Sequence, residues 1–351
     1  DDAPAKMIIT YSDRRAEEIY SDLRFYSRDV YMYPAKDILF FSADVHGNAI
    51  TRRRMEVLRK LATGEKCTIV ATVDALFDKI PALSYMNRYV INIHTMDHLN
   101  LDELKGKLVD LGYEKTDSVE EPGQFAVRGG IIDIFPLTED CPYRIDMWDD
   151  EVDTIKTFDA ESQRSIENVD QLVIYPAGEM VLSKDRINRG IRRIKNELAS
   201  YSKKLKAEFK TEAYARIKRE VAELEEQLTE FSATYGVDSY VDYFYSDTVS
   251  IIDCLPEKSF VFIDETSKVS DRAVSSEQSF VSAMSHRLEG GYVLPGQLGV
   301  MYSYDDVIQK MRNYRTVGLD AFTSEDEHIR YAHRAEIECR EVHSYRNNFD
   351  S

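Results

Sequence analysis

Residues 121–136 read EPGQFAVRGGIIDIFP, and residues 142–153 read PYRIDMWDDEVD. Both stretches are strand-like, and apolar and polar side chains alternate along the second, which is typical of a β-strand with one buried face. In the second stretch, this period of two assigns to the core face Tyr143, Ile145 and Met147. The opposite face receives Arg144, Asp146 and Trp148. The two stretches therefore predict paired strands of a small sheet that keeps one face open to solvent.

The composition of this open face has two interpretations. Trp148 is the only tryptophan of the chain, and a large aromatic side chain among charged ones is typical of a protein–protein hot spot. Under the other interpretation Trp148 merely covers the edge of the sheet, and Arg144 pairs with Asp146 or Asp149. Composition alone favours neither interpretation.

The first strand adds a further basic residue to the open face. Arg128 lies beside Gly129-Gly130, and the paired glycines indicate a bulge that could re-aim neighbouring side chains. Upstream, leucines at helical spacing follow Asn100, a residue that caps helices well. We expect residues 94–176 to form one small α+β unit around the two strands.

The rest of the chain has an α/β pattern. Short apolar runs and stretches of helical spacing follow one another at 7–10, 13–25, 49–61, 68–71, 89–93 and 260–263. Such alternation favours a parallel sheet with helices on its faces. The predicted fold class is therefore α/β, a parallel-sheet domain interrupted by the small α+β domain. The predicted division is 1–93, 94–176 and 177–351.

A long, highly charged helical segment is predicted at residues 183–231. Two series of apolar residues, one from Ile187 to Leu205 and one from Ile217 to Phe231, recur at steps of three and four. The break at 210–213 indicates either a turn between two helices or a shift of register. We interpret the charges outside these series as a solvated face.

A nucleotide site is incomplete in this chain. The apolar run 260–263 ends in Asp264-Glu265, which resembles a Walker B motif, where the acids hold magnesium and orient water. No Gly-x-x-x-x-Gly-Lys-Ser/Thr run is present to bind the phosphates. We therefore predict a degenerate site, no catalysis and no cofactor for this chain.

Composition limits the remaining functions. The 351 residues are 43% hydrophobic and 31% charged, with a net charge of −18 that argues against an extended non-specific contact with DNA. Basic residues on the helix at 49–61, from Arg52 to Lys60, could touch nucleic acid, but a solvated helix face is the preferred interpretation. Four scattered cysteines and the absence of a long apolar run predict a reduced, cytoplasmic chain without metal or membrane contact. The start, Asp1-Asp2-Ala3-Pro4, suggests part of a longer protein.

The two stretches resemble the signature shared by the excision-repair protein UvrB and the transcription-repair coupling factors. The order of the parts is also similar: a helicase-like (RecA-type) domain 1a, an inserted domain 2, then domain 1b. In that family domain 2 binds UvrA, and the resemblance assigns this role to Arg128, Arg144 and Trp148. The family commonly has phenylalanine at the last position, so the tryptophan keeps a large apolar group but changes its fit.

Two features favour the coupling factors over UvrB. Little room follows residues 33–41 for the DNA-clamping hairpin of UvrB, and Asp264-Glu265-Thr266-Ser267 departs from its Asp-Glu-Ser-His. The resemblance implies a full-length, ATP-driven DNA translocase that contacts RNA polymerase and double-stranded DNA, with ATP and magnesium in a motor domain outside this chain. The alternative is a truncated UvrB-type ATPase and DNA-binding subunit of the excinuclease.

Overall fold

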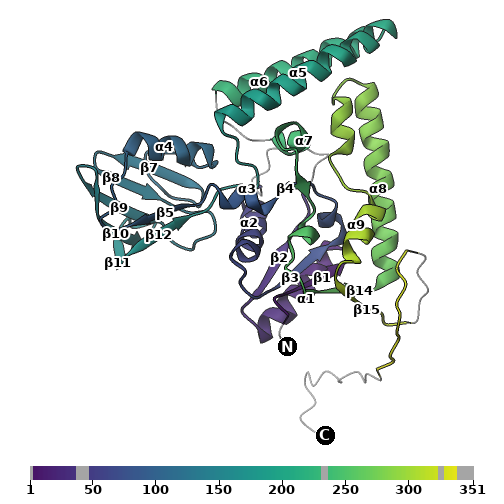
Figure 1. The fold of residues 1–351 in the computed structure, drawn as a ribbon, viewed down its shortest axis with the longest axis horizontal. Coiled ribbons are helices and arrows are strands. Elements are labelled where there is room, and N and C mark those ends of the chain that lie inside the picture. The colour runs from purple at the N-terminus through teal and green to yellow at the C-terminus, as the bar shows by residue number, and fades with distance from the viewer. Residues whose placement is uncertain (1–2, 37–46, 231–235, 323–327, 338–351) are drawn as a thin grey trace, which may run out of the picture.

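The computed structural model describes residues 3–36, 47–230, 236–322 and 328–337. Figure 1 shows a small sheet with one covering helix on one side, a larger sheet with its helices at the centre, and a pair of long helices at the periphery. Most of the link after Tyr33, on which the comparison with the UvrB hairpin rests, lies outside the described residues. The mixed α/β class and the separate small domain are confirmed.

The larger sheet is parallel throughout. Its strands lie in the order β15 (Arg315–Leu319), β14 (Phe260–Asp264), β1 (Ala5–Thr10), β3 (Cys67–Thr72) and β2 (Val30–Tyr33). Helix α1 (Asp13–Tyr26) packs through Ala16 on one face, over Val30 and Val70. The other face is covered by α2 (Gly47–Thr63), α8 (Thr266–Glu289) and α9 (Tyr304–Met311). Burial of both faces explains why these strands are apolar without alternation.

The small sheet is mixed and has six strands. Their order is β11 (Ser165–Val169), β10 (Glu151–Phe158), β9 (Tyr143–Trp148), β8 (Ile131–Ile134), β7 (Gln124–Arg128) and β6 (Glu114–Lys115). Helix α4 (Leu101–Asp110) covers one face with Leu104 and Leu108. The side chain of Asn100 caps α4 by accepting hydrogen bonds from the Asp102 and Glu103 amides, both at 3.0 Å. The predicted helix, cap and strand pair are thus confirmed.

One predicted strand joins a different sheet from the one expected. The apolar run at 89–93 forms β5 (Ile91–His94), which pairs antiparallel with β12 (Gln171–Ile174) and not with the parallel sheet. Ile93 and Leu172 are buried in the same core as α4, so this two-stranded ribbon belongs to the packing of the small domain. The apolar run alone could not show this, because pairing depends on residues almost eighty positions away.

The charged segment forms two helices. Helix α5 (Lys184–Ala207) and helix α6 (Thr211–Glu230) are joined by a turn in which Phe209 adopts φ 58°. The predicted apolar residues pack together, with Ile194, Leu205 and Ile217 buried; Phe231, the last of them, lies outside the described residues. The short elements are η1 (Val73–Leu76), β4 (Ile80–Pro81), α3 (Leu83–Asn87), η2 (Val237–Tyr240), α7 (Val241–Phe244), β13 (Thr248–Val249), η3 (Ile251–Cys254) and η4 (Pro295–Gly299).

A buried ionic cluster connects the exit of the small domain to the parallel-sheet core. The side chain of Arg54 is fully buried and binds Asp78 (Nη1–Oδ2 2.7 Å) and Glu179 (Nε–Oε1 2.7 Å). Lys36 also binds Glu179, at 2.6 Å. Burial raises the pKa of Asp78 to about 6, whereas the charges of Arg54 and Lys36 overcome burial and hold the pKa of Glu179 at about 2. Arg54 is therefore a structural residue and not part of an exposed basic face.

Candidate docking face

Register places the predicted residues on the open face of the small sheet. Ile145, on the core face of β9, is fully buried, whereas Trp148 is 80% exposed. Across β8 and β9, Asp133 lies opposite Arg144, and Ile131 lies opposite Asp146. The period of two therefore brings Arg144, Asp146 and Trp148 to one face, as the alternation predicted.

Arg144 is held by an aspartate that the sequence did not single out. Its Nε and Nη2 atoms donate to the two carboxylate oxygens of Asp133, at 2.6 and 2.9 Å. These hydrogen bonds raise the pKa of Arg144. The guanidinium also lies 4.4 Å from the ring centroid of Phe158 and donates to the side chain of Gln163. The pairing with Asp146 or Asp149, which one of the two interpretations required, is wrong, because Asp133 faces Arg144 directly across the strand pair.

Asp133 holds Arg128 as well. Nη2 of Arg128 lies 2.5 Å from Asp133 Oδ2, and half of the Arg128 side chain remains exposed. The Asp133 side chain has no exposed surface, so one buried carboxylate fixes two guanidinium groups on the open face. The sequence did contain a signal for this role, because Asp133 is a charged residue between Ile132 and Ile134 in a predicted strand.

Arg128 lies on β7, and Arg144 and Trp148 lie on β9, with β8 between the two strands. Gly129 and Gly130 form the turn between β7 and β8, with Gly129 at φ 59°, so the predicted bulge is wrong. A Cβ on Gly130 would lie 3.1 Å from the Met147 carbonyl oxygen, which leaves little room for a side chain beside β9. Trp148 ends β9 at the next turn, where Asp149 adopts φ 57°.

Neighbouring polar groups on this face are already paired. Asp146 accepts from Lys156 Nζ at 2.7 Å and from Thr154 Oγ1 at 3.0 Å. Ile131 is 37% exposed, and it adds apolar surface to this face because it lies opposite Asp146 across the strand pair. The indole of Trp148 is thus an exposed apolar group on a face whose charged side chains are positioned in advance.

The Walker B-like acids do not fit a magnesium site. Asp264 accepts from Arg15 through both oxygens, Nε–Oδ2 and Nη2–Oδ1 each at 3.0 Å, and from Thr10 Oγ1 at 2.9 Å. Glu265 adopts φ 61° and lies 3.5 Å from Lys268. A metal ligand needs a free oxygen facing the ion, and Asp264 offers none without losing Arg15.

The basic residues of α2 face carboxylates. Arg52 binds Asp140 at 2.8 Å, Arg53 binds Glu17 at 2.6 Å and Arg59 binds Glu139 at 2.7 Å. Lys60 pairs with Glu65, and Arg54 is the buried residue of the ionic cluster described above. These pairs neutralise the charge that phosphate groups would otherwise attract, which supports the preferred interpretation of this helix.

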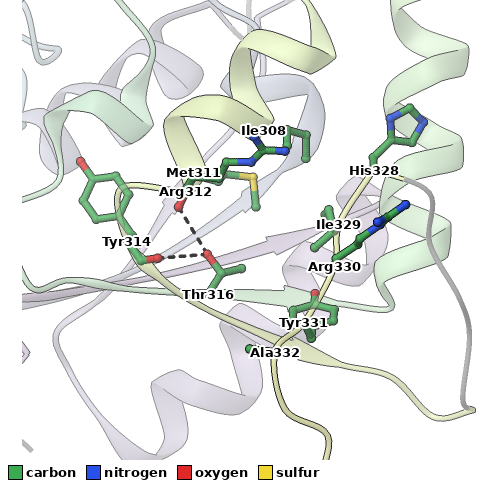
Figure 2. Close-up of a pocket in the computed structure, with 10 residues that line it drawn as sticks. All are labelled: Ile308, Met311, Arg312, Tyr314, Thr316, His328, Ile329, Arg330, Tyr331 and Ala332. Carbon is green, nitrogen blue, oxygen red and sulfur yellow. Dashed lines mark hydrogen bonds between the residues drawn. The ribbon is translucent and has the colours of Figure 1, made fainter.

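A hollow of about 630 Å³ lies elsewhere, between α9, β15 and residues 328–332. Figure 2 shows Arg312, His328 and Arg330 around it, with Tyr314 and Tyr331 from its other sides. No carboxylate is among the ten residues that line it.

Comparisons with known proteins identify the small domain. Residues 91–180 match the family model of the UvrB interaction domain. This match contains β5, the whole six-stranded sheet and β12. The chain corresponds to the N-terminal region of transcription-repair coupling factors.

Relatives with that name match nearly the whole chain. The transcription-repair-coupling factor of Bacillus subtilis (strain 168) is 30% identical over 308 residues, covering 87% of this chain and 26% of the relative. Those of Staphylococcus aureus (strain bovine RF122 / ET3-1) and Staphylococcus epidermidis (strain ATCC 12228 / FDA PCI 1200) are each 25% identical over 350 residues, covering 98% of this chain and 29% of the relative. The chain thus spans between a quarter and a third of their length. Among the described residues, no helix is long and apolar enough to cross a bilayer.

Proposed function

We propose that the open face of the small sheet is a docking surface for UvrA, which the chain would recruit to lesions where RNA polymerase has stalled. One observation carries the proposal: Trp148 is 80% exposed on the same sheet face as two guanidinium groups held by the buried Asp133. Exposed aromatic and arginine side chains are the groups that dominate protein–protein binding energy. The match to the UvrB interaction domain over residues 91–180 supports the choice of partner.

The fixed geometry of Arg144 and Arg128 supports binding rather than catalysis. Asp133 and Phe158 restrain the Arg144 side chain before any partner arrives, so little rotamer entropy is lost on docking. The half-exposed Arg128 retains donors for a carboxylate or carbonyl group of the partner. We infer that Trp148 supplies the apolar anchor and the arginines supply orientation.

We also propose the wider context of this module. Residues 1–93 and 177–351 would form a helicase-like, RecA-type domain, and residues 94–176 the inserted UvrA-docking domain. The longer protein would be a cytoplasmic, ATP-dependent DNA translocase that contacts RNA polymerase and double-stranded DNA. Its ATP and magnesium would be bound by a motor domain beyond this chain. The coupling-factor relatives, of which the chain spans between a quarter and a third, support this context.

The chain itself would be non-catalytic. The alternative, a truncated UvrB-type ATPase, requires Asp264 to bind magnesium, and Arg15 occupies both of its oxygens. Thermal unfolding with and without magnesium-ATP separates the two functions. We expect no rise in melting temperature, whereas a nucleotide-dependent rise would support the ATPase.

Binding of purified UvrA to single-residue variants tests the docking face. Trp148→Ala removes an exposed side chain, so the fold should be retained while UvrA affinity falls by at least about thirtyfold, the equivalent of about 2 kcal/mol. Phe25→Ala on α1 is the matched control, because that aromatic side chain is also exposed, at 84%. Unchanged affinity for Trp148→Ala, or an equal loss for Phe25→Ala, would reject the proposed surface.

A further inference from the structure

Helix α5 differs in charge from the chain as a whole. The chain carries a net charge of −18, whereas the only acidic residues of α5 are Asp185 and Glu197. Its basic residues are Lys184, Arg186, Arg189, Arg192, Arg193, Lys195, Lys203, Lys204 and Lys206. Figure 1 shows α5 at the periphery of the molecule, packed against α6. A strongly basic helix on the surface of an acidic chain indicates attraction to an anionic partner.

Five of these basic residues form one exposed stripe, which we call the α5 stripe: Arg189, Arg192, Arg193, Lys203 and Lys204. At about 100° per residue they fall within an arc of about 120°, and at 1.5 Å per residue they extend over about 22 Å of helix. Glu197 lies at the edge of this arc, where it accepts hydrogen bonds from the Tyr243 hydroxyl and the Gly296 amide. Asp185 falls on the same arc, one turn before Arg189, so only the stretch from Arg189 to Lys204 is free of carboxylates within the arc.

The charges of the α5 stripe are largely unpaired. Within the part of the chain that the structure describes, the side chains of Arg189, Arg192, Lys203 and Lys204 make no hydrogen bond or ion pair, although Glu208 is a charged neighbour of Lys204. Arg193 donates only to the Tyr243 carbonyl oxygen, at 3.2 Å. This arrangement contrasts with α2, whose basic residues each face a carboxylate.

We propose that the α5 stripe binds the phosphate backbone of double-stranded DNA. A duplex carries one negative charge about every 1.7 Å, so a row of about 22 Å meets a dense line of phosphates. Between these basic residues, the same side of the helix carries the short side chains of Asn196 and Ser200. These short side chains let the helix approach the DNA closely. An interface with an acidic protein would need an apolar or aromatic anchor in the stripe. The nearest exposed candidate, Phe209, lies beyond the end of α5.

Fluorescence anisotropy with a labelled 30-base-pair duplex of arbitrary sequence tests this proposal. The wild-type chain is titrated between about 50 and 200 mM salt, beside a variant with glutamine at positions 189, 192, 203 and 204. Each phosphate contact contributes about 0.9 to the slope of log affinity against log salt, so losing four contacts should reduce the slope by about 3.6. Glutamine keeps helix propensity, and an unchanged circular-dichroism melting curve verifies the fold.

A control variant with the same net charge separates the effect of the α5 stripe on DNA binding from the effect of net charge. Four other exposed basic residues are replaced by glutamine in the control: Arg28, Lys115, Arg312 and Arg330. The control should retain the wild-type slope within about one unit, since those residues are scattered over other elements. The proposal is overturned if the wild-type chain does not bind duplex at 50 mM salt, or if both variants weaken binding equally. Binding to a polyglutamate peptide without binding to duplex would also overturn it, and would assign the stripe to an acidic protein.

Discussion

Replacing Asp133 by alanine is expected to destabilise the small sheet and to release both arginines of the docking face. The Asp133 side chain is completely buried, and that of Arg144 is 18% exposed. The substitution removes two hydrogen bonds to Arg144, at 2.6 and 2.9 Å, and one to Arg128. It also leaves the Arg144 guanidinium without its counter-charge in a partly desolvated site.

The structure sets the size of this effect. Hydrogen bonds to charged groups contribute about 1.5–3 kcal/mol each, and breaking a buried ion pair costs about 3–5 kcal/mol. Arg144 keeps its contacts with Gln163 and with the ring of Phe158, which offsets part of the loss. Arg128 is half exposed, so water replaces its lost partner at little cost. We therefore expect a loss of about 3 kcal/mol in the local free energy of unfolding.

Hydrogen exchange measured by mass spectrometry reads this loss directly in strands β8 and β9. The control is Asp146→Ala on the same face, whose partner Lys156 is 29% exposed, so we expect less than about 1 kcal/mol there. If Asp133→Ala reduces protection no more than this control does, Asp133 does not organise the face.

Three further substitutions test the buried ion pairs and the helix packing. Glu179→Gln should lower the free energy of unfolding by about 3 kcal/mol at pH 7, because the pKa of Glu179 in the folded chain is about 2, below the ordinary 4.5. The stability difference between wild type and variant should persist down to about pH 4.5 and disappear as the pH falls toward 2, which denaturant unfolding at a series of pH values would measure. Gly190→Ala should lower the melting temperature despite better helix propensity, because the new Cβ would lie 2.2 Å from Phe244; a rise would show that the ring relaxes freely. Asp264→Ala should destabilise the chain by about 1–2 kcal/mol through loss of the Arg15 pair, and a change in ATP hydrolysis without a change in stability would contradict this structural role.

Local patterns predicted the elements but not all their partners. The period of two along 143–148 correctly assigned the faces of β9, because Ile145 is buried whereas Trp148 is exposed. Helix α4 followed from spacing and its cap, and helix α5 from spacing alone. The strand β5 was assigned to the wrong sheet because an apolar run carries no information about which distant strand it will pair with.

The candidate site was predicted in its exposed members and missed in its buried one. Arg144 and Trp148 stood out because charge and an aromatic ring alternate with core residues, and Arg128 because it lies beside Gly129-Gly130 on the partner strand. Asp133 was overlooked, although its polar position within an apolar strand signals a buried partner. The burial of Arg54 could not be foreseen either, since its partners Asp78 and Glu179 are distant in sequence and meet it only in the folded chain.

The most direct test of the docking face uses the single tryptophan of the chain as its own reporter. Biosynthetic 5-fluorotryptophan labelling gives one ¹⁹F resonance, from Trp148, and unlabelled UvrA adds none. We predict that the resonance shows the solvent isotope shift of an exposed indole in the free chain, and that saturating UvrA moves it and reduces that isotope shift. If UvrA co-elutes with the chain in gel filtration while the Trp148 resonance keeps its position and its solvent sensitivity, UvrA binds elsewhere and the central claim is wrong.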